Sequence, residues 1–92
     1  MNNLLSDRDT ETVYDILVEQ LGVPKEELVP DARLYQDCGA DSLTLMEIAM
    51  ALEERLNLSV PDQDWENVQT VLQVFETVSE AIMKRDQPQP RA

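Results

Sequence analysis

The chain passes from a loop into a helix at one pentapeptide, Gly39-Ala40-Asp41-Ser42-Leu43. Before it lies a long stretch rich in turn residues, and after it apolar residues recur at helical spacing as far as Leu56. A serine at the mouth of a helix is exposed, so we expect the hydroxyl of Ser42 to point away from the core. The chain contains no histidine that could activate this hydroxyl. The position therefore predicts a poor nucleophile but a good attachment point for a group made elsewhere.

Size and charge limit the function classes that the chain can serve. Its 92 residues are expected to form one small domain with a modest core. The net charge is −12, from 19 acidic residues against 7 basic ones, which disfavours nucleic acids and anionic membranes as partners. An acidic surface instead favours basic patches on partner proteins. Cys38 is the only cysteine, so it excludes an internal disulfide and a zinc site made of cysteines.

We expect a soluble, cytoplasmic protein that works as a monomer. The N-terminus is polar and acidic, unlike a signal peptide, and the longest apolar run is too short to span a bilayer. An enzyme is not expected, because no nucleophile–base pair or phosphate-binding glycine loop is recognisable. Asp62 and Asp64 do not continue into a calcium-binding loop, and we predict no metal site.

Apolar periodicity predicts two long helices in the first part of the chain. The first begins at residue 6 or 7 and ends before Gly22. Its buried face consists of Val13, Ile16, Leu17 and Leu21. The second begins at Asp41 or Ser42 and ends near Asn57. Its buried stripe consists of Leu45, Ile48, Ala49, Leu52 and Leu56.

The remaining segments predict a long first loop, a short helix and a last helix. Residues 22–41 form the loop, with one helical turn from Lys25 to Leu28. The short helix runs from about Asp62, its cap, to Asn67, and its anchors are Trp65 and Val68. The last helix opens with a capping box formed by Thr70 and Gln73. Its apolar face consists of Leu72, Phe75, Val78 and Ile82, with Val71 and Val74 beside them.

These elements predict an all-α fold, a small four-helix bundle of three main helices and one short helix. We expect the folded domain to cover residues 6–85. Residues 1–5 are predicted to be flexible and residues 86–92 to be a disordered tail, because the tail has nothing apolar to bury.

The second helix combines acidic and apolar residues outside its buried stripe. Glu47 and Glu54 are seven residues apart and share a face, and Asp41 lies near the same edge. The apolar residues that leave the stripe are Leu43, Met46 and Met50. Exposed apolar side chains among acids are typical of a docking surface, and methionine adapts to several partners. Methionine is also ordinary core filler, and for Met46 both interpretations stay open.

The chain resembles the acyl carrier proteins from about Thr12 to Ile82. The specific parts are Asp37-Cys38-Gly39-Ala40-Asp41-Ser42-Leu43, then Met50-Ala51-Leu52-Glu53-Glu54, then Val60-Pro61-Asp62. The resemblance implies that Ser42 carries a covalent 4′-phosphopantetheine arm derived from coenzyme A, whose thiol holds acyl groups as thioesters. It also implies two kinds of partner, a phosphopantetheinyl transferase and acyl-processing enzymes with basic docking patches.

The resemblance assigns roles to further residues. Asp41 and Leu43 flank the attachment serine. The residues expected to contact partners are Asp41, Leu43, Glu47, Met50, Glu53 and Glu54. The acyl chain is expected to retreat between the helices, where the lining candidates are Leu52, Val68 and Val71. The departures from the family pattern are Thr44 in place of an acid, Cys38 in place of a leucine and Trp65 in place of a smaller residue.

The leading hypothesis is an acyl carrier protein of fatty-acid, polyketide or related biosynthesis, and the departures favour a specialised pathway. The nearest alternative is a stand-alone aminoacyl or peptidyl carrier, although the second helices of those carriers tend to be less acidic. A different class is an unmodified acidic helical adaptor for basic partners. Such an adaptor needs no attachment serine, so replacing Ser42 distinguishes it from any carrier.

Overall fold

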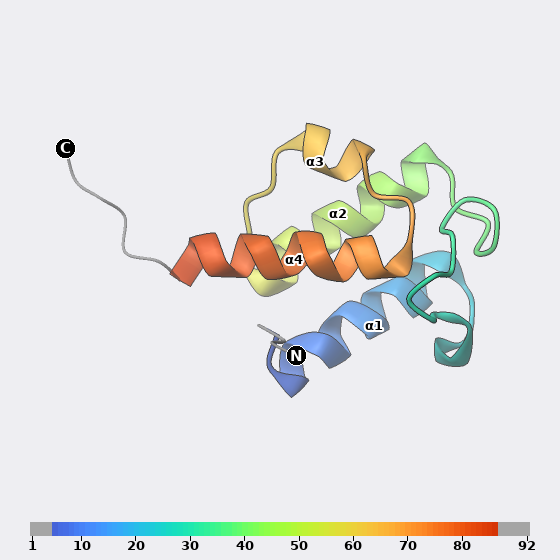
Figure 1. The fold of residues 1–92 in the computed structure, drawn as a ribbon, viewed down its shortest axis with the longest axis horizontal. Helices are drawn as coiled ribbons and strands as arrows, with labels where there is room; N and C mark the ends of the chain where they lie inside the picture. The colour runs from blue at the N-terminus through green and yellow to red at the C-terminus, as the bar shows by residue number, and fades with distance from the viewer. Residues whose placement is uncertain (1–4, 87–92) are drawn as a thin grey trace.

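The computed structural model describes residues 5–86, and within them the chain forms four α-helices and no strand beyond a single bridge (Figure 1). The helices are α1 (Asp7–Leu21), α2 (Ser42–Leu56), α3 (Asp62–Glu66) and α4 (Val71–Asp86), and a 3₁₀ turn, η1, covers Lys25–Glu27. The predicted all-α fold, with three main helices, one short helix and a long first loop, is confirmed.

Local capping fixes the ends of α1 and α2. The Oγ of Ser6 accepts a hydrogen bond from the backbone N–H of Asp9 at 3.1 Å, which satisfies a free donor at the start of α1. Gly22 ends that helix in a left-handed conformation with φ of 71°, which glycine adopts without strain. Asn57 ends α2 in the same region, with φ of 57°. All three positions match the sequence prediction.

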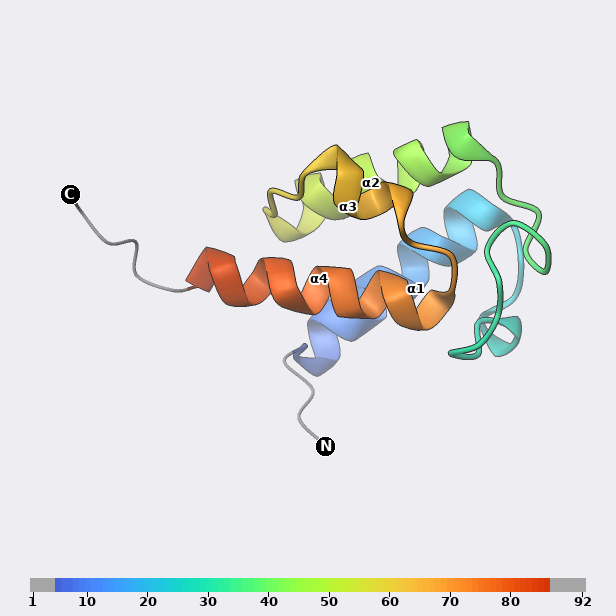
Figure 2. The ribbon, with the colours of Figure 1, turned by 45° about the horizontal axis from the view of Figure 1, so that its top comes forward.

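The core lies where α1, α2 and α4 meet. Helix α1 packs against α2, and the ribbons of α4 and α1 cross in the view of Figure 2. The Tyr14 and Phe75 rings join α1 to α4, with centroids 5.0 Å apart. Arg85 of α4 donates a hydrogen bond from Nη1 to the carbonyl oxygen of Leu56, so it caps the C-terminus of α2. The largest fully buried side chains are Val13, Ile16, Leu17, Leu34, Ile48, Leu52, Val71, Val74 and Val78.

The structure corrects the expected ends of the domain and the cap of α3. Leu5 is buried in the core, although the sequence predicted it to be flexible, and Asp86 belongs to α4 rather than to the tail. The remaining residues of both predicted flexible ends, 1–4 and 87–92, lie outside the described residues. Pro61 occupies the N-cap position of α3, so Asp62 is the first helical residue and no side chain caps this helix.

Helix α4 buries its predicted apolar face with one exception, Leu72. Its capping box is as predicted: Gln73 N donates to the Oγ1 of Thr70 at 3.2 Å, and Thr70 N donates to the Oε1 of Gln73 at 3.0 Å. Leu72, however, is 48% exposed, whereas Val71 is fully buried. The N–H groups of both residues donate to the first loop, Val71 to the carbonyl of Ala32 and Leu72 to that of Pro30, each at 3.0 Å. The start of α4 is therefore held against this loop, with Val71 on the core side and Leu72 on the surface.

Candidate functional site

The first loop is tied to the far end of the chain before it reaches α2. The N–H of Leu34 donates to the carbonyl of Gln69 at 2.8 Å, and Arg33 forms a single antiparallel bridge with Thr70. The side chain of Leu34 is fully buried. These contacts anchor the loop to the segment between α3 and α4, which fixes the place where α2 can begin (Figure 1).

An ion pair closes the last part of this loop. Asp37 accepts hydrogen bonds from the backbone N–H of Arg33 at 2.9 Å and from its guanidinium at 3.1 and 3.2 Å. The guanidinium hydrogen bonds, with the backbone N–H, hold the pKa of Asp37 below its ordinary value. Gly39 follows with φ of 75°, and the N–H of Ala40 returns to the carbonyl of Leu34 at 2.9 Å. Asp41 follows directly after this closed turn.

Asp41 caps α2 and places Ser42 at its first position. The Oδ1 of Asp41 accepts from the backbone N–H of Thr44 at 2.8 Å and from its Oγ1 at 2.9 Å. These two hydrogen bonds lower the pKa of Asp41, so the cap is a carboxylate at neutral pH. Thr44, which the sequence analysis noted only as standing in place of an acid, therefore has a structural role: it pairs with the cap of α2. The side chain of Ser42 is exposed, as predicted.

A groove runs from Ser42 along α2 and α3. We call it the α2–α3 groove, and its volume is about 360 Å³. Its lining residues are Tyr35, Ser42, Leu45, Met46, Ala49, Met50, Glu53, Asp62, Trp65 and Glu66. Ser42 thus stands at the helix mouth and also on the groove wall, so a flexible arm on its oxygen has both solvent and an apolar-walled groove within reach.

The predicted acyl-cavity residues do not line this groove. Leu52 and Val71 are fully buried in the core, and Val68 lines a separate shallow hollow beside α4. The predicted list of cavity residues omitted several that do line the groove, including Tyr35, Met46 and Ala49. A signal for the α2 residues existed: positions 42, 45, 46, 49, 50 and 53 follow helical spacing from the attachment serine. No comparable local signal identifies Tyr35, which lies in the loop.

The predicted docking residues lie on the exposed side of α2. Leu43, Met46 and Met50 are 62%, 61% and 64% exposed, so Met46 is not core filler. Glu47 and Glu54 are also exposed. Glu53 is half-buried and its Oε2 accepts a hydrogen bond from the N–H of Val60 at 3.2 Å, so it also holds the turn after α2. The arrangement presents large apolar side chains among carboxylates around Ser42.

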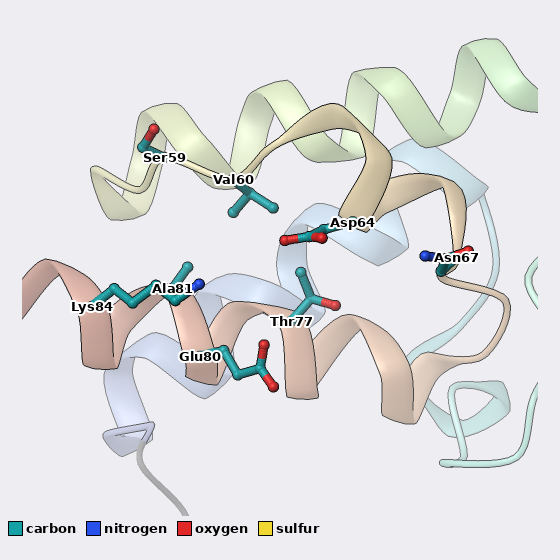
Figure 3. A pocket seen from close by; sticks show the side chains of 8 residues that line it. All are labelled: Ser59, Val60, Asp64, Asn67, Thr77, Glu80, Ala81 and Lys84. Carbon is teal, nitrogen blue, oxygen red and sulfur yellow. The ribbon is translucent and has the colours of Figure 1, made fainter.

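A second hollow lies on the other side of α3. Its volume is about 200 Å³, and we call it the α3–α4 hollow. Figure 3 shows Asp64 of α3 opposite Thr77 and Glu80 of α4, with Lys84 further along α4. These side chains are polar or charged, so this hollow is poorly matched to an acyl chain.

Two further features of the described residues bear on the site. Cys38 is a free, buried thiol, and burial raises its pKa, which makes it a weak nucleophile. Residues 5–86 contain no group of three potential metal ligands and no helix long and apolar enough to cross a membrane.

Comparisons with known proteins agree with this geometry. The family model described as a phosphopantetheine attachment site matches residues 11–78. An acyl carrier protein from Syntrophobacter fumaroxidans is 45% identical over 64 residues, covering 70% of this chain and 79% of the relative. The solution structure of the acetyl actinorhodin acyl carrier protein from Streptomyces coelicolor is 32% identical, has a TM-score of 0.67, and the match covers 92% of this chain and 99% of the other. The chain therefore belongs to the acyl carrier protein family, whose domain carries a 4′-phosphopantetheine arm.

Proposed function

We propose that Ser42 bears the 4′-phosphopantetheine and that the chain presents acyl thioesters on it to the enzymes of a biosynthetic pathway. The observation that carries the proposal is the double placement of Ser42, exposed at the first position of α2 and also on the wall of the α2–α3 groove. An exposed hydroxyl is accessible to a modifying enzyme. A neighbouring groove gives the attached chain somewhere to rest when no enzyme holds it.

The residues of this chain position the arm and shelter its cargo, and they supply no acid or base for the reaction. When bound, the arm supplies a thiol that holds the acyl group as a thioester. Asp41 keeps the first turn of α2 intact through Thr44, so the oxygen of Ser42 stays at a fixed place on the surface. The tether raises the effective concentration of the acyl group at any enzyme that docks the carrier.

We assign the docking role to an α2 face formed by Asp41, Leu43, Glu47, Met50, Glu53 and Glu54. Its exposed apolar members can enter hollows on a partner, and its carboxylates attract the rim of basic residues expected around such hollows. The first partner is a phosphopantetheinyl transferase, and acyl-processing enzymes follow. The net charge of −12 steers basic partners toward the chain.

For the pathway, we favour specialised biosynthesis of the polyketide type over housekeeping fatty-acid synthesis. Two observations support this choice. A solved structure that resembles this chain is the actinorhodin carrier, and Thr44 stands where housekeeping fatty-acid carriers have an acid. A free, buried Cys38 fits a reducing compartment, so the cytoplasm is our proposed location.

The test is intact-protein mass after incubation with coenzyme A and a promiscuous phosphopantetheinyl transferase. We expect the parent to gain one phosphopantetheine and Ser42→Ala to gain none. Ser59→Ala is the matched control, because Ser59 is also exposed but lies in the turn after α2, and it should load like the parent. Loading of Ser42→Ala would place the arm elsewhere, and a folded parent that gains nothing would favour the unmodified adaptor.

A further inference from the structure

Trp65 contains the one buried side-chain nitrogen or oxygen without a hydrogen-bond partner in the part of the chain that the structure describes. The side chain is 5% exposed, and the orphan atom is the indole Nε1. Buried donors are normally paired, because a buried N–H that has lost water and gained no acceptor costs free energy. An orphan of this kind calls for a specific explanation.

The same residue is a wall of the α2–α3 groove, into which Ser42 also faces. The side chains around it include Met46 and Met50, which are flexible and exposed. Methionine has three rotatable bonds and repacks readily, so a chain entering the groove can displace these side chains and reach the indole. The residue that carries the orphan donor and the attachment serine thus line the same groove.

We propose that the indole N–H of Trp65 donates a hydrogen bond to a carbonyl oxygen of the chain tethered to Ser42 when that chain lies in the α2–α3 groove. This inference rests on the proposed function. The carbonyl has three possible sources: a keto group of the acyl cargo, the thioester carbonyl and an amide of the arm. A keto-bearing cargo is the expected source, since the groove then distinguishes an oxygenated chain from a fully reduced one.

The charges of the groove explain why the acceptor is neutral. An indole nitrogen is a donor only, so it can recognise an acceptor and nothing else. Glu53, Asp62 and Glu66 line the same groove, and their carboxylates repel a cargo that ends in a carboxylate. A saturated acyl chain brings no acceptor beyond the thioester carbonyl, which both acyl forms share, and its hydrocarbon part leaves the N–H unpaired. A ketone satisfies the donor without adding charge.

The experiment uses the single tryptophan of the chain, whose indole N–H gives one isolated cross-peak in a ¹H–¹⁵N NMR spectrum. Four forms are compared: unmodified, arm only, saturated acyl, and 3-oxoacyl of the same length. We expect the indole proton to move downfield and to exchange several-fold more slowly in the 3-oxoacyl form only. The same change in the arm-only form would assign the acceptor to an arm amide, and the same change in both acyl forms but not in the arm-only form would assign it to the thioester carbonyl. An identical peak in all four forms would overturn the proposal.

A variant pair separates recognition from packing. Trp65→Phe keeps a ring but removes the N–H, and Tyr35→Phe removes the other polar tip of an aromatic side chain in the groove. We expect the 3-oxoacyl form of the parent to melt at a higher temperature than the saturated form, with this difference lost in Trp65→Phe and kept in Tyr35→Phe. A difference that persists in Trp65→Phe would rule out the indole as the donor.

Failure of the proposed function has a different signature. If mass spectrometry finds no arm on Ser42, the attachment is wrong, but the groove can still be tested with a free 3-oxoacyl thioester of N-acetylcysteamine. Titration of this probe should still shift the indole peak, whereas the saturated thioester should not. No response to either probe would overturn the assignment of Trp65 independently of Ser42.

Discussion

The two sides of α3 differ in chemistry. Toward α2, the groove beside Ser42 is walled mainly by leucine, alanine, methionine and aromatic side chains, together with the carboxylates of Glu53, Asp62 and Glu66. Toward α4, the hollow in Figure 3 is walled mainly by Asp64, Asn67, Thr77, Glu80 and Lys84. One short helix forms a wall of both, but it presents Trp65 to the groove and Asp64 to the hollow, so the difference comes from the two faces of α3 as well as from α2 and α4. Proximity to α3 therefore does not decide the occupant: an acyl chain suits the first hollow, and water suits the second.

The largest expected effect is on stability, from the residue that anchors α3 itself. Trp65→Ala should lower the free energy of unfolding by about 3–5 kcal/mol, because it removes a buried aromatic ring from a helix with no side-chain cap. Urea denaturation followed by circular dichroism measures this loss. Trp65→Phe should lose clearly less, and equal losses in the two variants would mean that the ring is not the anchor.

The next largest effect tests whether partners dock on the outer face of α2 rather than on that of α4. Glu47→Lys combined with Glu54→Lys should slow loading by a transferase on the order of tenfold or more, since steering charges change association rates by that much. The helical circular-dichroism signal should be unchanged. The matched control is Glu76→Lys with Glu80→Lys, exposed residues on α4 that change the net charge equally. Equal slowing by both pairs would show that only net charge matters and that α2 has no special docking role.

The contrast between α2 and α4 also explains what could be predicted from the sequence. The caps at Ser6, Asp41 and Thr70 are local signals, because each side chain bonds to a backbone N–H three residues ahead. The first residues of α1, α2 and α4, and with them the position of Ser42 in its helix, follow from such signals. They were therefore predictable without knowing how the helices pack.

The exposure of Leu72 was not predictable in this way. Leu72 and Val71 both fit a helical stripe, and the choice between them depends on how the start of α4 packs against the first loop, to which both N–H groups donate. The buried position of Leu52 did follow from the stripe of α2, but periodicity does not show which buried residues line a groove. Tyr35 reaches the groove because the loop is closed by contacts between residues far apart in sequence, and periodicity carries no information about them.

A smaller expected effect is that the caps of α2 and α4 contribute to the melting temperature with a different dependence on pH. Asp41 has its pKa held below the ordinary 3.8 by hydrogen bonds from Thr44. A lowered pKa means that the carboxylate stabilises the fold fully above the ordinary value, and that this contribution is lost as the pH falls through the lowered pKa. The parent should therefore melt higher than Asp41→Asn at neutral pH, and the difference should disappear in acid.

The cap of α4 provides the control for that pH dependence. Thr70 and Gln73 are uncharged in the capping box, so Thr70→Ala should lower the melting temperature by the same amount at neutral and acidic pH. Thermal melts of the three proteins across the acidic range measure both differences. A parent–Asp41→Asn difference that stays constant into acid would show that the charge of Asp41 does not contribute to the cap.

The smallest expected effect comes from the α3–α4 hollow. Thr77→Val replaces a half-buried hydroxyl on α4 with a methyl group of similar size, and it should change the free energy of unfolding by no more than about 0.5 kcal/mol. It should also leave the NMR shifts that acylation causes in α2 and α3 unchanged, because the groove proposed for the acyl chain is on the other side of α3. Altered acylation shifts in Thr77→Val would mean that the chain reaches the polar hollow as well. The distinction between the two sides of α3 would then be one of degree.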